Sequence, residues 1–346
     1  MTGLSRLAQR PAHCVVVAEM PALEDDGRLD PARNKDPHIM KAAYIEKFGG
    51  PEVLTYGDLP DPTAGPGQIV VDTVAVSING ADAKVCGGEY GGQPKFPMIL
   101  GRDFSGAISA VGTGVQDLKV GDEVFGVLET GRDGTYCEKI AIGAAIVARK
   151  PAAMTHVEAA ALALTGLTAL CSIEDSLKLK PGETILIQGG AGGVASFAIQ
   201  LAKHIGARVI TTASAANRDF LLELGADQVI DYNTTDFTKA VNDCDAVFDT
   251  VGGDVAIRSF AVLRPGGRAA FIASGAQAPK PERSDVTSLR PAVGRDRPHL
   301  ERILELRRLG AVRAPHVTEY SLAQAADALA VSAARHLKGK LVLKVQ

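Results

Sequence analysis

The amino-acid sequence predicts an α/β protein with two domains, a β-barrel-like domain and a doubly wound parallel sheet. Two observations carry this prediction. Short strands separated by glycine and proline turns fill residues 40–150, and strands alternate with helices from residue 184 to about residue 274. A chain of 346 residues with 46% apolar and 22% charged residues is also long enough for two cores of ordinary composition.

The first 39 residues differ from the rest of the chain. Their apolar patch at residues 14–18 is too broken for a signal-peptide core, and a polar, turn-rich segment follows it. We expect residues 1–39 to form a flexible extension with no role in the fold. Met40 opens the first strand, KAAYIEKFG.

The clearest strands of the first domain are residues 68–76, 104–111 and 123–127. Residues 156–179 then form an alanine- and leucine-rich helix. Five strand cores follow, in the order ILIQ, RVITTA, QVIDY, DAVFDTV and RAAFIA.

The tail returns to a helix at residues 322–333 and a final strand at residues 341–345. We expect this strand to rejoin the first domain, which would make that domain discontinuous in the sequence.

A tight glycine turn follows the strand ILIQ. The run Gly190-Ala191-Gly192-Gly193-Val194-Ala195 has the G-x-G-x-x-A pattern and opens a helix. The first glycine permits a sharp turn, the second lets the main chain approach a pyrophosphate, and the small third residue lets the helix pack on the strand. The amides and the helix dipole favour phosphate at this end. The stretch therefore predicts a dinucleotide-binding βαβ unit.

The end of the next strand bears on which dinucleotide binds. An NAD-specific protein usually has an Asp or Glu there for the ribose 2′-hydroxyl, and residues 211–218 contain none. Ser214 and Arg218 could instead bind a 2′-phosphate, which favours NADPH. The alternative is that Ser214 caps the helix that starts near Ala215 and Arg218 is a solvated surface charge.

Composition excludes several classes of protein. A formal charge of −3 gives no basic surface for nucleic acid or an anionic membrane. We see no apolar run of the length needed to cross a bilayer, and therefore expect no membrane partner. Five scattered cysteines indicate a reducing compartment, so we expect a cytoplasmic location.

A set of motifs in order resembles one known family. These are KAAYIEKFGGPEVL, SINGADAK, ILGRDFSGAISAVG, GDEVFGV, ALTGLTAL, the glycine turn, LGADQVIDY, VFDTVGG and GKLVLKV. Together they resemble the zinc-free quinone oxidoreductase branch of the medium-chain dehydrogenase/reductase superfamily, from Met40 to the C-terminus.

The resemblance implies a GroES-like β-barrel domain and a Rossmann domain that flank a cleft. The implied limits are 40–160 for the first part of the GroES-like domain, 161–300 for the Rossmann domain and 301–346 for the return. It also implies NADPH as cofactor, a small quinone or enone as substrate, and a homodimer formed through the Rossmann sheet edge.

The departures from zinc-dependent relatives predict that no metal takes part. Those relatives have Cys and Gly-His-Glu where this chain has Asn79 and Gly101-Arg102-Asp103. An amide and a guanidinium cannot replace the ligands that zinc requires. The seven histidines are isolated in the sequence. Without a Lewis acid, reduction of a quinone or enone is favoured over oxidation of a simple alcohol.

The resemblance suggests catalytic residues in the segment Asn79-Gly80-Ala81-Asp82-Ala83-Lys84. Asn79, Asp82 and Lys84 match the family, whereas Gly80 replaces a proline. Lys84 is expected near the nicotinamide ribose or the substrate oxygen, as electrophile or proton donor. The alternatives are a surface lysine on an irregular loop and an aspartate that only pins that loop.

Tyr136 matches an aromatic residue on a cleft-facing strand of the family. It could close the pocket over the substrate, and the alternative is packing. Cys86 has no activating partner in the sequence, and we treat it as structural.

Further matches to the family imply contacts with the cofactor. Their alternative roles are bonds from helix threonines to backbone carbonyls and ordinary packing at strand ends. These residues are Thr165, Thr168, Tyr232, Thr250, Ile272 and Ala273.

Two other functions stay open at this point. One is a dedicated biosynthetic enoyl or ketone reductase, and the other is a non-catalytic NADPH-binding redox sensor or structural protein. We assign no role to residues 277–297, which we interpret as a polar, proline-rich loop.

Overall fold

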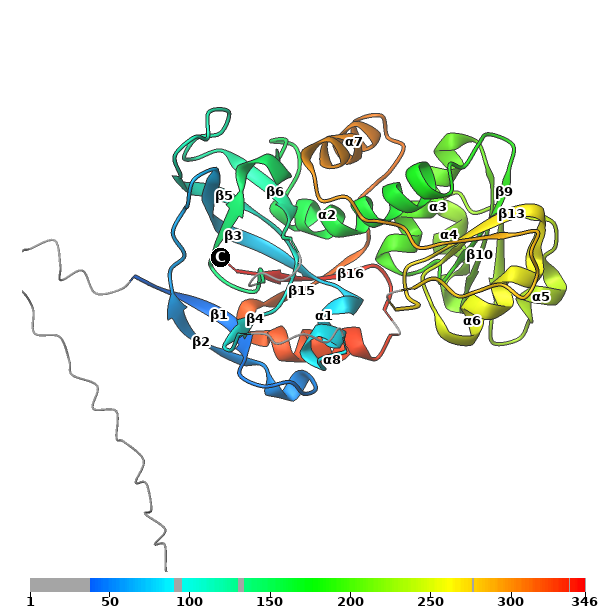
Figure 1. The fold of residues 1–346 in the computed structure, drawn as a ribbon, viewed down its shortest axis with the longest axis horizontal. Helices are drawn as coiled ribbons and strands as arrows, with labels where there is room; N and C mark the ends of the chain where they lie inside the picture. Colours follow the sequence, from blue (N-terminus) through cyan, green and yellow to red (C-terminus); the bar gives the residue numbers. More distant parts are fainter. Residues whose placement is uncertain (1–37, 90–94, 130–133, 276, 336, 346) are drawn as a thin grey trace, which may run out of the picture. The chain divides into compact units, whose positions relative to one another are not determined.

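The computed structural model describes residues 38–89, 95–129, 134–275, 277–335 and 337–345 (Figure 1). The expected N-terminal extension falls on residues 1–37, outside the described residues. Strand β1 covers Ile39–Ile45 and thus begins one residue earlier than predicted. From Ile39 onward the chain is a single compact unit.

The first part of this unit is rich in β-structure. One sheet has the order β2-β1-β4, and a larger sheet has the order β15-β16-β3-β5-β6-β8, with β7 also pairing with β3. The predicted strands at residues 68–76, 104–111 and 123–127 are confirmed as β3, β5 and β6. The bounds are β2 Thr55–Pro60, β3 Gln68–Ile78, β4 Met98–Ile99, β5 Asp103–Val111, β6 Glu123–Val127, β7 Lys139–Gly143, β8 Val147–Arg149, β15 Val317–Ser321 and β16 Lys340–Lys344.

The final strand closes this part of the molecule. β16 pairs antiparallel with β3, and Leu341 faces Ile78 in the register. Figure 1 shows this strand, coloured red, beside the blue β3. The predicted return of the C-terminal strand to the first domain is therefore confirmed.

The second part is a parallel sheet with the order β11-β10-β9-β12-β13-β14. All five predicted strand cores are confirmed, and their order reverses at β9, where the crevice beyond the carboxyl ends binds ligands in such sheets. The bounds are β9 Thr184–Gln188, β10 Arg208–Ala213, β11 Gln228–Asp231, β12 Cys244–Asp249, β13 Leu263–Phe271 and β14 Thr287–Leu289.

Strand β14 corrects our interpretation of residues 277–297 as a loop. The strand runs parallel to β13, with Arg268 opposite Thr287. Only three residues take part, so neither length nor alternation distinguished it from a loop in the sequence.

The helices are α1 Gly80–Cys86, α2 His156–Leu170, α3 Gly193–Ile205, α4 Arg218–Glu223, α5 Phe237–Ala240, α6 Gly253–Arg258, α7 Arg297–Arg308 and α8 Ala325–Ala333. A π-helical stretch, Cys171–Ser176, continues α2. Helix α3 confirms the predicted apolar helix after the glycine turn, and Gly206 ends it with a φ of 95°.

The helix His156–Ser176 corrects our statement about apolar runs. Among the described residues, this one helix has the length and the apolar composition that crossing a membrane would require. However, 78% of its most apolar window is buried inside the protein, where α2 packs against β3, β5, β6 and α3. Its apolar character is thus explained by its position in the core.

Candidate active site

The glycine turn joins the carboxyl end of β9 to α3. Gly189 has a φ of 74°, and its N–H donates to Thr212 Oγ1 at 3.1 Å. The N–H of Gly190 donates to the carbonyl of Thr212 at 2.9 Å. A Cβ on Gly190 would lie 2.3 Å from Thr211 Oγ1. The bend is therefore held against β10 and leaves no room for a side chain at Gly190.

The next two glycines differ in what they face. A Cβ on Gly192 would meet only Gly189 O, at 3.5 Å, whereas a Cβ on Gly193 would lie 2.8 Å from the side chain of Lys340. Packing inside the protein therefore explains why residue 193 is a glycine, but it does not explain why residue 192 is one. Val194, in the first helical turn, has an N–H group without an acceptor inside the helix, whereas the bridge between Gly192 and Gly339 engages the N–H of Gly193. This end of α3 thus fits a phosphate group.

The two residues that could bind a ribose 2′-phosphate, Ser214 and Arg218, lie just after β10. Ser214 occupies the N-cap position, but no backbone N–H bonds to its side chain. Its Oγ accepts a hydrogen bond from Asn217 Nδ2 at 3.1 Å, so the capping alternative is wrong for the side chain. Arg218 is exposed, and its Nη1 donates to Val229 O at 3.2 Å.

The other strand-end residues also lie at the carboxyl edge of the sheet. Thr250 Oγ1 donates to Gln188 O at 2.8 Å, which ties β12 to the start of the glycine turn. The N–H of Ile272 donates to Asp249 O at 3.2 Å, and Ala273 follows it. Tyr232, after β11, is 54% exposed.

Thr165 and Thr168 turn their hydroxyls to their own helix. Thr165 Oγ1 donates to Ala161 O, and Thr168 Oγ1 donates to Leu164 O at 2.7 Å. The methyl group of Thr165 would lie 3.0 Å from a Cβ on Gly193. Thr165 therefore adjoins the glycine turn through its methyl group, with its hydroxyl already bonded.

Residues 80–86 form helix α1, so the alternative that placed Lys84 on an irregular loop is wrong. Asn79 is the N-cap, and its N–H donates to Asp82 Oδ2 at 2.8 Å. This capping bond, which depends on Asp82, starts the helix although glycine replaces proline at the first position. Lys84 is partly exposed and makes no ion pair or side-chain hydrogen bond with another described residue.

A buried polar network lies beneath Asn79. Lys340 Nζ donates to Asn79 Oδ1 and to Ile78 O, both at 2.7 Å. Asn79 Nδ2 donates to Asp103 Oδ1 at 3.0 Å, and Ser77 Oγ donates to Asp103 Oδ2 at 2.8 Å. The side chain of Asn79 is thus oriented from both sides, by a cation and by a carboxylate.

Tyr136 extends this network and corrects our expectation for it. The residue lies in a bend, not on a cleft-facing strand, and its side chain is fully buried. Its hydroxyl donates to Asp82 Oδ2 at 2.8 Å. Asp82 is itself 1% exposed, so neither side chain is open to a substrate. Asp82 Oδ2 thus accepts hydrogen bonds from both the Tyr136 hydroxyl and the N–H of Asn79.

Burial controls the electrostatics of this network. Desolvation raises the pKa of Asp82 to about 6, and hydrogen bonds from Asn79 and Tyr136 oppose the shift. Desolvation also raises the pKa of Asp103, against the opposing charge of Lys340. For the same reason the pKa of Lys340 is lowered, and Asp103 opposes that change. Lys340 therefore offsets part of the charge of the two carboxylates, which repel each other, where water cannot.

Sequence reasoning missed Ser77, Asp103 and Lys340 as members of the site. Asp103 had been considered only at the position of a lost zinc ligand, and Lys340 only as part of the motif GKLVLKV. Lys340 and Ile78 are 262 positions apart, so no local spacing connects them.

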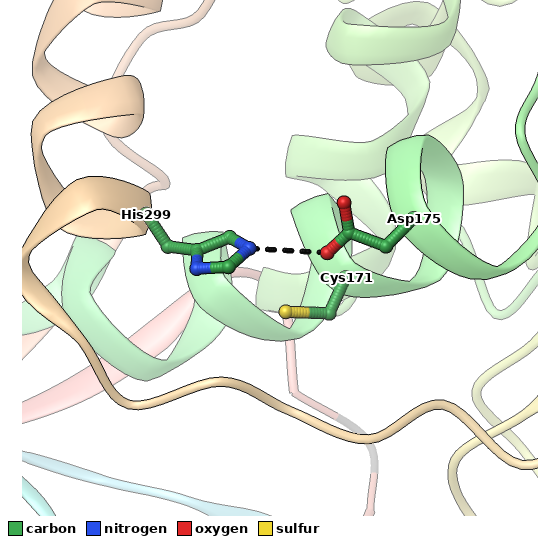
Figure 2. A group of neighbouring side chains, drawn as sticks. All are labelled: Cys171, Asp175 and His299. Atoms are coloured by element: carbon green, nitrogen blue, oxygen red, sulfur yellow. Dashed lines mark hydrogen bonds and ion pairs between the residues drawn. The ribbon is translucent and has the colours of Figure 1, made fainter.

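The positions that match zinc ligands are engaged in other contacts. The amide of Asn79 is bound as described, and Arg102 Nη1 lies 3.4 Å from Glu129 O. Among the described residues, one group of Cys, His and carboxylate side chains has its ligand atoms within 4.8 Å, namely Cys171, Asp175 and His299 (Figure 2). Our description of the histidines as isolated is wrong for His299, which contacts Asp175 across 124 positions.

Two family models match the chain. Residues 65–152 match the alcohol dehydrogenase GroES-like domain, and residues 224–343 match the zinc-binding dehydrogenase model. The two matches fall on the β-rich part and on the second half of the chain, in the order that the motifs indicated.

Curated relatives include enzymes of different length. The chain is 34% identical to a 2-methylene-furan-3-one reductase of Solanum lycopersicum over 77% of this chain and 70% of that protein. It is 32% identical to a mycocerosic acid synthase-like polyketide synthase of Mycobacterium tuberculosis over 87% of this chain. The chain spans only 15% of the length of that synthase.

A solved structure shows the same fold over its whole length. The quinone oxidoreductase of Escherichia coli, determined in complex with NADPH, superimposes with a TM-score of 0.81 at 28% identity. The superposition covers 88% of this chain and 100% of that chain.

Proposed function

The chain belongs to the medium-chain dehydrogenase/reductase superfamily, and from this premise we propose that it is an NADPH-dependent oxidoreductase. It transfers a hydride to a quinone or to an α,β-unsaturated carbonyl compound, without a metal ion in the cleft. The observation that carries the proposal is the glycine turn, where a Cβ on Gly192 would meet only Gly189 O, at 3.5 Å, beside the first-turn amides of α3. The quinone oxidoreductase and reductase among its relatives support the reaction class.

The fit of the cofactor rests on the donors at the turn. The N–H group of Val194 would donate to the diphosphate, and the missing Cβ at Gly192 lets it approach the main chain. Bound NADPH supplies the hydride. Thr250, Ile272 and Ala273 would line the nicotinamide side at the strand ends.

NADPH rather than NADH is supported by the residues after β10. An exposed guanidinium at Arg218 and the hydroxyl of Ser214 suit a 2′-phosphate, and no carboxylate lies between Thr211 and Arg218. We further assign Tyr232, which is exposed, to the edge of this phosphoribose site.

Lys84 is the catalytic group that we assign. When the β-carbon of an enone is reduced, negative charge builds up on the carbonyl oxygen and needs a hydrogen-bond donor. Lys84 is partly exposed, lies on the helix that Asn79 caps, and has no other partner among the described residues. Its ammonium group would donate to that oxygen. Asn79 and Asp82 hold the start of the helix in place.

The test is NADPH oxidation with a panel of quinones, enones and enoyl thioesters. Turnover with quinones or simple enones is expected, and turnover with thioesters alone would favour a dedicated biosynthetic enzyme. Lys84→Ala should lower kcat on enones about 100-fold and leave the Kd for NADPH nearly unchanged. The control is Lys180→Ala, an exposed lysine before the amino end of β9. Binding of NADPH without turnover on any acceptor would favour the non-catalytic alternative.

We also propose a homodimer formed along β14. In the described sheet this strand pairs with β13 alone, so its other edge has backbone groups available to a second copy. Light scattering of the purified protein measures the mass, and a monomer at micromolar concentration would contradict the proposal.

A further inference from the structure

A cluster of metal-ligating side chains lies where the π-helical end of α2 meets the start of α7. Figure 2 shows Cys171, Asp175 and His299 turned toward one another. His299 Nε2 lies 3.1 Å from Asp175 Oδ2. The Sγ of Cys171, which is buried, completes a group whose ligand atoms all lie within 4.8 Å. The cluster takes no part in the proposed hydride transfer.

The imidazole of His299 has the environment of a metal-binding histidine. Its Nδ1 lies 2.8 Å from both carboxylate oxygens of Asp296, at the N-cap of α7. A carboxylate behind one ring nitrogen fixes the tautomer and directs the lone pair of the other nitrogen toward a metal. Here that other nitrogen, Nε2, faces Asp175 and Cys171.

We propose that Cys171 Sγ, Asp175 Oδ2 and His299 Nε2 bind a zinc ion. Thiolate, imidazole and carboxylate together form a ligand set that zinc accepts in tetrahedral geometry. In such a site, ligand atoms lie about 3.5 Å apart; here they lie within 4.8 Å of one another, so the group needs to contract by about 1 Å at most. The side chains of Asp175 and His299 are 55% and 31% exposed, which leaves a route for the ion and a fourth position for water.

Charge balance supports the binding of a cation. Asp175 and Asp296 both contact one imidazole, so the cluster is negative overall whether that ring is neutral or protonated. The neighbouring Glu174 is already paired with Arg302 at 3.0 Å. A divalent ion would neutralise the remaining charge.

The competing explanation is a protonated imidazole that bridges two aspartates without a metal. That explanation accounts for His299, and it leaves the thiol of Cys171 hydrogen-bonded to the carboxylate of Asp175 and to the N–H of Gly294, at 3.3 Å from Sγ. The two explanations differ in whether the thiol is a metal ligand, which the cobalt spectrum reports. Zinc would join the end of α2 to the segment before α7 through all three side chains.

The experiment is metal binding by the chelator-treated full chain. One equivalent of zinc is expected by competition with a chromophoric chelator, and cobalt should give a thiolate-to-metal charge-transfer absorption band. The isosteric variants Cys171→Ser and Asp175→Asn, and His299→Gln, should each lose the zinc. Asp296→Asn, which keeps the helix cap, should weaken binding about tenfold. His204→Gln, on the exposed face of α3, should bind as the parent does.

Two results would overturn the assignment. One is the absence of stoichiometric zinc binding at micromolar concentrations. The other is a bound zinc whose affinity, and whose cobalt spectrum, does not change in Cys171→Ser. NADPH oxidation is measured in parallel and should survive chelation, since the cluster is separate from the proposed catalytic residues. Loss of activity on chelation would instead contradict the metal-free reaction and leave the zinc site standing.

Discussion

The glycine turn and the network beneath Asn79 are two parts of one proposed active site, built in opposite ways. At the turn, the proposed recognition depends on main-chain N–H groups and on the absence of a Cβ at Gly192, whereas Gly190 and Gly193 are required by packing. In the network, charged side chains meet in a place that water does not reach, and Asp82, Asp103 and Lys340 are all at most 5% exposed.

This difference determines how each region responds to change. The turn is sensitive to volume and has no titratable group of its own. The network tolerates little change of charge, because each buried ion depends on its partners. Substitutions at the turn should therefore act through steric contact and ligand affinity, whereas substitutions in the network should act through stability and pH.

The largest expected effect comes from removing the buried cation. Lys340→Met leaves the carboxylate of Asp103 without its charge partner, and should lower the free energy of unfolding by about 3–5 kcal/mol. The matched control is Lys344→Met on the same strand, whose exposed ion pair with Glu319 spans 3.6 Å. That change should alter stability by less than about 1 kcal/mol. Equal effects in denaturant unfolding would remove the contrast between buried and surface charge.

The network should also give stability a dependence on pH. Because the pKa of Asp82 is raised to about 6, the folded state holds this proton more tightly than the unfolded state. The contribution to stability is complete below about pH 4 and disappears as the pH rises through 6, a loss of about 3 kcal/mol. Asp82→Asn should reduce this slope without abolishing it, because burial also raises the pKa of Asp103. Asp327→Asn, on the surface of α8, should retain it, and an unchanged slope in Asp82→Asn would contradict the assignment.

Two single-methyl substitutions separate packing from ligand binding at the turn. Gly190→Ala places a Cβ 2.3 Å from Thr211 Oγ1 and should lower stability by about 1–3 kcal/mol. Gly192→Ala, where φ is −71°, should leave stability nearly unchanged. It should nevertheless weaken NADPH binding about tenfold, because the methyl group occupies the space assigned to the diphosphate. Calorimetric titration measures the Kd, and a parent-like Kd in Gly192→Ala would move the diphosphate elsewhere.

The smallest expected effect concerns the 2′-phosphate. Arg218→Ala should weaken NADPH binding about 5- to 10-fold and leave NADH binding unchanged, because only NADPH carries the added charge. Arg208→Ala, an exposed arginine at the amino end of β10, is the control. Equal affinities of the parent for the two nucleotides would refute the preference for NADPH.

The two regions also differ in how far they could be predicted. The turn was predictable because the strand, the glycines and the helix that define it are contiguous, from Thr184 to Gly206. The network was not, because Ser77, Asp103 and Lys340 meet only after β3, β5 and β16 have paired. Asn79 and Asp82 were identified as candidate site residues by the family resemblance. A resemblance indicates positions in the sequence, but it does not indicate which atoms those side chains contact.

Side-chain direction was the least predictable property. Tyr136 matched a cleft residue, yet its hydroxyl points to the buried Asp82. Ser214 lies at a helix N-cap position, yet its side chain bonds to the side chain of Asn217 and to no backbone N–H of the helix. His299 looked isolated because its partner Asp175 is distant in the chain. For Tyr136 and His299 a tertiary contact decided the outcome, whereas for Ser214 it was the choice between two local partners.

The pairing of β16 with β3 has a consequence for biosynthesis. All strands of the parallel sheet, β9 to β14, precede residue 290, so that sheet can assemble before the last residues are translated. Strand β3 is made early, but it acquires its β16 neighbour only after residue 344 has left the ribosome. Until then residues 75–78 of β3, beyond those that pair with β7, present an open edge to other nascent or unfolded chains.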